Sequence, residues 1–387
     1  MRNNRPAVVI LLCLCFALPV LGDDQSGPID WNKAQQIYKK RQSGESLNAD
    51  EQQYLQRAIE ARQKGEGPRL QGQQAQGPGA NAGPDKVKGI SPLNEMEGRY
   101  KGEDGGLYGK GRYEPAEAQK KLAKKASGNI RLLDAEGNPS ENGKIALLTI
   151  GMSNTSQESD AFIRLEKNNT EKSNRVVLVN GAQGGITADR WIPGSPLEAK
   201  VWNNVEERLK SAGVSFPQVQ AVWLKEAIAE PAAKGEFPAH AKFLLDSLSA
   251  LVRYAKVKCP NLQLIFLSSR IYGGYAATRL NPEPYAFESA FPVRWLIREQ
   301  SGESPELNAD PALGAVKAPV LLWGPYLWAN GEEPRKSDGL VWKKEDFGPD
   351  GTHPSQAGTQ KVAKLLAEFF KSSEYTRQWY LKGDTRK

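Results

Sequence analysis

Residues 145–155 have the sequence IALLTIGMSNT, which contains the clearest fold signal in the chain. The run 145–150 is apolar apart from one threonine and is typical of a buried strand, which Gly151 then ends. Ser153 follows this glycine, and a helix can begin near Gln157. A serine in such a turn can attack an acyl carbon if a neighbouring base takes its proton.

The chain on both sides of this segment continues to alternate between short apolar runs and helical periods. Buried strands are predicted at 145–150, 176–179, 219–224, 262–267 and 320–323, and helices at 197–212, 240–256, 291–300 and 355–371. This alternation predicts an α/β fold with a five-stranded parallel sheet between two layers of helices, a three-layer α/β/α arrangement. In such sheets the ligand site lies at the carboxyl ends of the strands.

Polar residues and glycines stand where the predicted strands end. Glycines there allow backbone N–H groups to approach a ligand closely. The residues selected as candidates for an oxyanion site or for substrate binding are Asn154, Gln183, Gly184, Gly185, Lys225, Arg270 and Tyr272.

The chain has two histidines, and only one of them suits a catalytic role. His240 begins a predicted amphipathic helix, where a surface or capping role is expected. His353 lies in a loop bounded by glycine and proline, with Asp350 three residues before it. A loop can fold this aspartate onto the ring and fix the tautomer that abstracts a proton. A turn capped by the aspartate is the alternative reading.

These blocks together resemble the SGNH hydrolases, also called GDSL-like esterases. The resemblance covers about residues 144–370 and implies a flavodoxin-like fold. It implies Ser153 as the nucleophile, Gly185 or Gly184 as an oxyanion donor, Asp350 as the orienting acid and His353 as the base.

The sequence departs from the family pattern in two places. Met152 stands where the family usually has aspartate, and the third strand ends in Trp-Leu-Lys-Glu without the Gly-x-Asn that supplies an amide donor. Lys225 or Asn154 can replace this donor. Equally, Lys225 can form a structural ion pair with Glu226 or Glu158.

Composition limits the classes of function. The formal net charge of +7 is mild, and lysines alternate with acidic residues, so no nucleic-acid partner is expected. Two histidines and, beyond the leader, one cysteine leave little material for a metal site, and no cofactor is expected. Glu283 and Glu288 are considered as substrate contacts, although solvent exposure explains both equally well.

The N-terminal third is organised in segments. Residues 1–22 are predicted to be a signal peptide, so a secreted or periplasmic protein without a stable membrane anchor is expected. Residues 30–64 are predicted to form a helical hairpin, either a protein-docking element or a solvated appendage. Residues 65–97 are predicted to be a flexible linker before an α/β domain at 98–387, which begins with an extended loop.

The sequence therefore predicts a secreted serine esterase that acts on a carbohydrate ester, such as an acetylated polysaccharide. Aromatic residues near the strand ends suggest stacking on sugar rings, although each of them can equally belong to the core: Trp191, Tyr272, Tyr285, Trp323, Tyr326 and Trp328. The alternative is a non-catalytic protein that binds a carbohydrate or another partner on the same fold.

Overall fold

The computed structural model describes residues 27–42, 47–63 and 89–383. The predicted signal peptide and most of the predicted linker lie outside these ranges. The chain divides into two compact units, Met1–Gln76 and Gly77–Lys387, and each is described by itself. Within the described ranges, no helix is long and apolar enough to cross a membrane.

The first unit contains two helices, α1 (Trp31–Gln42) and α2 (Ala49–Gln63). They pack through small and aliphatic side chains, which are Ala34 and Ile37 from α1 and Leu55 and Ala58 from α2. Asn48 and Glu51 form the expected capping box at the start of α2, because each side chain accepts a hydrogen bond from the other residue's backbone N–H group. Whether this hairpin docks onto a protein stays a prediction.

The second unit is built on one five-stranded sheet in which all neighbouring strands are parallel. Its strands, in the order β4-β3-β5-β6-β7, are β4 (Val176–Asn180), β3 (Ile145–Gly151), β5 (Val219–Lys225), β6 (Leu264–Leu267) and β7 (Val320–Trp323). This order is the flavodoxin-like one. Every residue of β3, β5, β6 and β7 is buried, as expected for strands covered on both faces.

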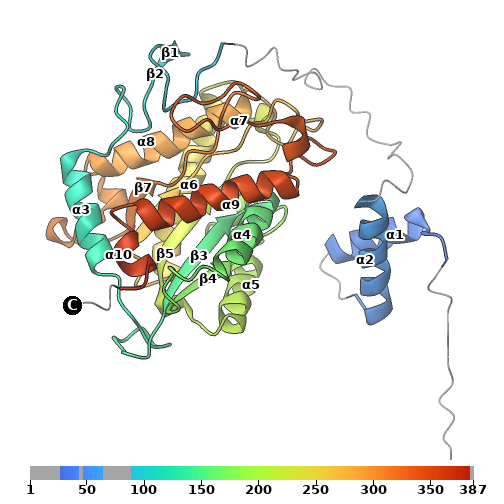
Figure 1. Cartoon of the computed structure of the whole chain (residues 1–387), viewed down its shortest axis with the longest axis horizontal. Coiled ribbons are helices and arrows are strands. Elements are labelled where there is room, and N and C mark those ends of the chain that lie inside the picture. Colours follow the sequence, from blue (N-terminus) through green and yellow to red (C-terminus); the bar gives the residue numbers. More distant parts are fainter. Residues whose placement is uncertain (1–26, 43–46, 64–88, 384–387) are drawn as a thin grey trace, which may run out of the picture. The chain divides into compact units, whose positions relative to one another are not determined.

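Helices cover both faces of the sheet, so the predicted three-layer α/β/α class is confirmed. α4 (Ser153–Glu166) and α9 (Gln356–Ser372) lie side by side on one face (Figure 1). The connections from β4 to β5, β5 to β6 and β6 to β7 run along the sheet in the opposite direction to the connection from β3 to β4. Because such crossovers are right-handed, their helices lie on the other face: α5 (Glu198–Ser211), α6 (Ala239–Lys258) and α8 (Ala290–Ser301). The remaining longer helix, α3 (Glu117–Gly128), packs on β6 and β7.

The segment before α3 is attached to the domain by buried charges. It contains a short antiparallel pair, β1 (Arg99–Tyr100) and β2 (Glu103–Asp104). Arg294 of α8 binds the Glu103 carboxylate and the carbonyl oxygen of Asp104. Tyr100 donates a 2.6 Å hydrogen bond to Glu288, at the end of the short helix α7 (Tyr285–Glu288).

The predicted linker at 65–97 is wrong at its C-terminal end. Leu93 and Met96 are buried in the main core, and the N–H group of Leu93 donates to the Tyr326 hydroxyl at 3.1 Å. The segment was predicted to be a linker because most of it is rich in glycine and proline. Its last residues nevertheless include these two apolar side chains, which pack into the core of the α/β domain.

Candidate active site

The turn between β3 and α4 fixes the position of Ser153. β3 ends at Gly151, Met152 occupies the N-cap position of α4 without a side-chain hydrogen bond, and Ser153 is the first residue of the helix. A Cβ atom added to Gly151 would lie 2.4 Å from the carbonyl oxygen of Lys225, so only glycine fits there. Thr155 donates a 2.8 Å hydrogen bond to the same oxygen and ties the turn to β5. The serine is half-buried at a helix N-terminus, where backbone N–H groups lack helical partners.

The loop before α9 holds Asp350 and His353. One oxygen of Asp350, Oδ1, accepts hydrogen bonds from the backbone N–H groups of Thr352 and His353, both at 3.0 Å. Gly351 has φ +63°, and a Cβ atom there would lie 1.8 Å from the carbonyl oxygen of Tyr275. The loop is therefore closely packed, and its backbone sets the direction of the histidine ring.

A chain of two hydrogen bonds joins Ser153, His353 and Asp350. The Ser153 Oγ lies 2.7 Å from His353 Nε2, and His353 Nδ1 lies 2.5 Å from Asp350 Oδ2. Burial by itself raises the pKa of Asp350, but hydrogen bonds from the His353 ring and from two backbone N–H groups outweigh burial and lower this pKa to about 2. A carboxylate that stays ionised favours the tautomer in which Nδ1 carries the proton and Nε2 accepts from the serine.

Gly184 and Gly185 lie at the edge of this arrangement. A Cβ atom on Gly184 would be 3.8 Å from the Cβ atom of Ser153, so the glycine backbone passes close to the serine. Both glycines are exposed, and Gly185 has φ +75°. Arg190 donates to the carbonyl oxygen of Gly185 at 2.6 Å and holds the loop. Within the described residues, neither glycine N–H group donates to a backbone carbonyl.

Gln183 was expected at the site, but its side chain serves the fold. Its Nε2 donates to the carbonyl oxygen of Val201 at 2.9 Å, and its Oε1 accepts from Asn204 at 2.7 Å. Both partners are on α5, so this glutamine joins the loop to that helix. Its position after a strand suggested a substrate contact because sequence position alone does not give the direction of a side chain.

Lys225 forms the ion pair that the sequence left as one alternative. Its ammonium group contacts both carboxylate oxygens of Glu158 on α4, and the two side chains are 1% and 0% exposed. Burial lowers the pKa of Lys225 to about 8, although Glu158 opposes the shift, and burial raises the pKa of Glu158. With its ammonium group held by this pair, Lys225 is poorly placed to serve as the missing oxyanion donor.

Asn154 and Arg270 are buried and retain unused donors. Asn154 is 2% exposed; its Oδ1 accepts from the backbone of Thr155, whereas its Nδ2 has no hydrogen-bond partner within the described residues. Arg270 is 3% exposed, and its Nε likewise has no hydrogen-bond partner in the described part of the chain. The Arg270 guanidinium interacts electrostatically with Asp350 and Glu158.

Tyr272 does not have the expected character of a substrate contact. It is 3% exposed and packs against Tyr275 and Trp328, with ring centroids 5.3 and 6.2 Å away. The alternative that these aromatic residues belong to the core is supported for four others near the strand ends, which are also buried: Trp191, Trp323, Tyr326 and Trp328. Tyr285 alone of the six is half-buried.

Three buried ionisable residues were missed or misread from the sequence. His240 and Glu288 are buried, and His240 Nε2 lies 2.7 Å from a carboxylate oxygen of Glu288. Glu288 also binds Lys101, in the turn between β1 and β2. Glu283 accepts hydrogen bonds from Trp328 and from two backbone N–H groups, and burial raises its pKa to about 7. Their sequence neighbours, which are prolines and helix starts, gave no signal of burial.

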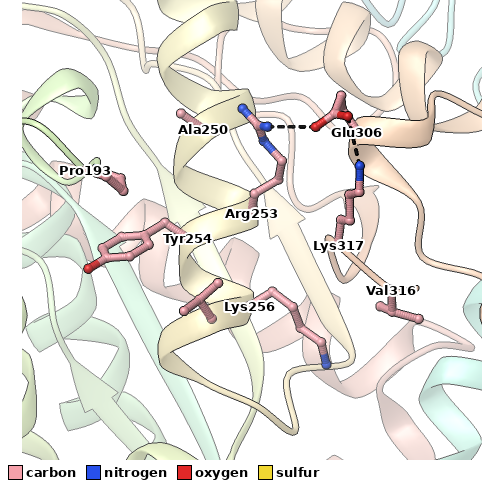
Figure 2. Close-up of a pocket in the computed structure, with 9 residues that line it drawn as sticks. Pro193, Ala250, Arg253, Tyr254, Lys256, Glu306, Val316 and Lys317 are labelled. Atoms are coloured by element: carbon pink, nitrogen blue, oxygen red, sulfur yellow. Dashed lines mark hydrogen bonds and ion pairs between the residues drawn. The ribbon is translucent and has the colours of Figure 1, made fainter.

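A separate hollow of about 690 Å³ lies along the C-terminal half of α6 and contains none of the residues above. Figure 2 shows that Arg253 and Lys317 both point to Glu306 across this hollow, with contacts of 3.2 and 2.8 Å. Within the described residues, no group of three or more His, Cys, Asp and Glu side chains is placed to hold a metal ion.

No family model matches this sequence, and no curated protein matches it. Among solved structures, the protein YxiM of Bacillus subtilis is similar at 12% identity with a TM-score of 0.33, over 59% of this chain and 56% of that one. A protein of Arabidopsis thaliana is similar at 18% identity with a TM-score of 0.27, over 54% of this chain and 67% of that one. The chain thus spans about half the length of YxiM.

Proposed function

We propose that this protein is a serine esterase of the SGNH type that hydrolyses a carboxylic ester by acyl transfer. The observation that supports the proposal is the chain of hydrogen bonds from Ser153 through His353 to Asp350. A hydroxyl, an imidazole and a carboxylate in this order provide a nucleophile, its base and the group that orients the base. The exposed glycines beside the serine fit a site that opens at the surface.

In the first step, Ser153 Oγ forms a bond to the ester carbonyl carbon while its proton moves to His353 Nε2. The carbonyl π electrons move to the oxygen, which becomes an oxyanion. The intermediate then collapses: the carbon–oxygen bond to the alcohol breaks, and the alcohol leaves with the proton from His353. The result is an acyl group on Ser153 and a neutral imidazole.

In the second step, water attacks the acyl carbon and gives its proton to His353. Collapse of this intermediate returns the proton to Ser153 Oγ and releases the carboxylic acid. Asp350 remains ionised throughout and stabilises each imidazolium, in agreement with its lowered pKa. No cofactor takes part in either step.

The oxyanion is held in this proposal by the backbone N–H groups of Ser153 and Gly185, with Gly184 as the alternative glycine. Removing one such donor from an esterase site lowers the rate by about 10²- to 10³-fold. Asn154 Nδ2 remains a candidate third donor because it has no partner.

For the alcohol we propose a carbohydrate, such as an acetylated polysaccharide. The surface position of Gly184 and Gly185 supports a large alcohol, because a polymer cannot enter a closed cavity. The buried aromatic residues give no support to sugar stacking.

Intact-mass analysis after exposure to a fluorophosphonate probe tests the proposal without knowledge of the substrate. The wild type should gain one adduct, and Ser153→Ala and His353→Ala should gain none. Ser211→Ala, on the outer face of α5, is the matched serine control and should label like the wild type. A folded wild type without an adduct would reject the proposal and favour the non-catalytic binding protein.

A further inference from the structure

Within the described residues, unpartnered buried polar atoms gather at the carboxyl ends of two central strands. They are Asn154 Nδ2 after β3, and Ser269 Oγ and Arg270 Nε after β6. Buried polar groups are normally hydrogen-bonded, and exceptions concentrate where a ligand completes the bonding. All three atoms are donors or can act as donors, so the ligand should bring an acceptor oxygen.

Arg270 has the largest unmet bonding capacity of this group. A guanidinium carries five N–H donors, yet within the described residues no hydrogen bond joins the guanidinium of Arg270 to another residue. The residue is only 3% exposed. Burying a cation without hydrogen-bonded partners is costly, which makes a purely structural role a poor explanation.

The strand register brings Arg270 towards Ser153. Gly151 of β3 pairs with Lys225 of β5, and the N–H group of Ser268, just after β6, donates to Leu224 at the same edge. Ser153 and Arg270 are each two residues further along, on the two strands that flank β5. Two strand spacings separate their backbones by about 10 Å, which an arginine side chain and a bound acyl group can bridge together. An electrostatic interaction between the Arg270 guanidinium and the Asp350 carboxylate agrees with this placement.

We propose that Arg270 is a further catalytic residue: its guanidinium donates to the acyl oxygen of the ester as that oxygen becomes negative. It thereby replaces the amide donor that the end of the third strand lacks. The proposal rests on the ester hydrolysis proposed above. A preorganised cation beside the reacting carbon stabilises a developing negative charge strongly.

The charges around Arg270 favour an oxyanion over a carboxylate of the substrate. The Lys225–Glu158 pair is neutral overall, whether its proton lies on one partner or the other. Asp350 balances Arg270, and burial raises the pKa of Glu283 and of Glu226, the other two carboxyl groups that interact with the guanidinium, so neither provides a fixed further charge. A substrate carboxylate would therefore add an excess negative charge. The oxyanion instead forms together with a positive imidazolium on His353 and leaves the total charge unchanged.

Arg270→Ala tests the proposal through two rates, fluorophosphonate labelling of Ser153 and turnover of p-nitrophenyl acetate. We expect the labelling rate and kcat to fall together by about 10²-fold with KM unchanged, because the lost contact forms only in the transition state. Added guanidinium chloride, at concentrations that leave the protein folded, should restore part of both rates. Arg253→Ala, which removes a half-buried arginine paired with Glu306 in the separate hollow along α6, should show neither the loss nor the rescue.

Arg270→Lys and Arg270→Gln serve if the alanine variant does not fold, which thermal melting shows. Lysine keeps the charge and should retain more activity than glutamine. Wild-type labelling of all the Arg270 variants would overturn the proposal, as would a loss seen only in Asn154→Ala. A defect confined to the KM of acetylated uronates would overturn it in favour of a substrate-carboxylate site. A wild type that does not label would instead reject the esterase itself, and this proposal with it.

Discussion

Asp350 binds His353 through both of its carboxylate oxygens. Oδ2 contacts ring Nδ1 at 2.5 Å, and Oδ1 accepts from the histidine's own backbone N–H at 3.0 Å. The two residues are three positions apart, so one tight loop fixes both the position of the ring and its tautomer. The sequence Asp-Gly-Thr-His thus forms the hydrogen bonds between these two residues locally, and the 275–278 segment holds the loop, since the N–H group of Ala277 donates to the carbonyl oxygen of Asp350 at 2.9 Å.

Asp350→Asn should leave the loop folded but reduce turnover. The amide can still accept from the backbone, but it no longer stabilises the imidazolium and favours the wrong tautomer of His353. In a comparable triad this change lowers kcat by about 10⁴-fold. Turnover of p-nitrophenyl acetate measures the effect, with circular dichroism as the folding control. Activity close to wild type would show that Asp350 is a structural cap only.

The same carboxylate should make stability depend on pH in the acid range. Its pKa is lowered to about 2 in the folded protein from an ordinary value near 4. A group with a depressed pKa stabilises the fold above its unfolded pKa, and that contribution disappears as pH falls through its folded pKa. Between about pH 4 and pH 2 the melting temperature of the wild type should therefore fall more steeply than that of Asp350→Asn. Parallel curves would contradict this linkage.

The sheet could be predicted from the sequence because its strands are buried on both faces. β3, β5 and β7 are near-continuous apolar runs, and such runs identify a strand without any knowledge of its neighbours. Ser153, Asp350 and His353 were also placed together, since parallel strands direct their carboxyl ends to one edge.

What the sequence could not give was the direction of individual side chains. Gln183 and Tyr272 stand at strand ends as predicted, yet one binds α5 and the other packs among aromatic rings. Glu226 and Glu158 were both predicted as possible ion-pair partners of Lys225, and only the tertiary structure shows that Glu158 is the partner. The burial of Leu93 and Met96 could not be predicted, because two apolar residues next to a Gly- and Pro-rich segment form no periodic pattern.

The Lys225–Glu158 pair should be costly to break from either side. Lys225→Met leaves a fully buried carboxylate without its cation, and such a loss costs about 3–5 kcal/mol of unfolding free energy. The double variant Lys225→Met/Glu158→Gln should recover a large part of it, because no unpaired charge remains. Urea unfolding measures both. Lys210→Met, which breaks an exposed pair with Glu206, is the control and should change little. An equally small effect at Lys225 would show that the pair is hydrated.

Gly151→Ala should destabilise the turn that carries Ser153, whereas Gly184→Ala should not. The added methyl group at Gly151 would lie 2.4 Å from the Lys225 carbonyl oxygen on β5 and 2.5 Å from the Thr155 side chain on α4. Because these atoms lie on two different elements, a shift of one element alone does not relieve both clashes. Such overpacking costs about 1–3 kcal/mol. At Gly184 the nearest atom is 3.8 Å away, an ordinary contact. Urea unfolding compares the two variants. Fluorophosphonate labelling of folded Gly151→Ala should also be slow, because relief of the clash displaces Ser153 from His353; rapid labelling would show that the turn adjusts without moving the serine.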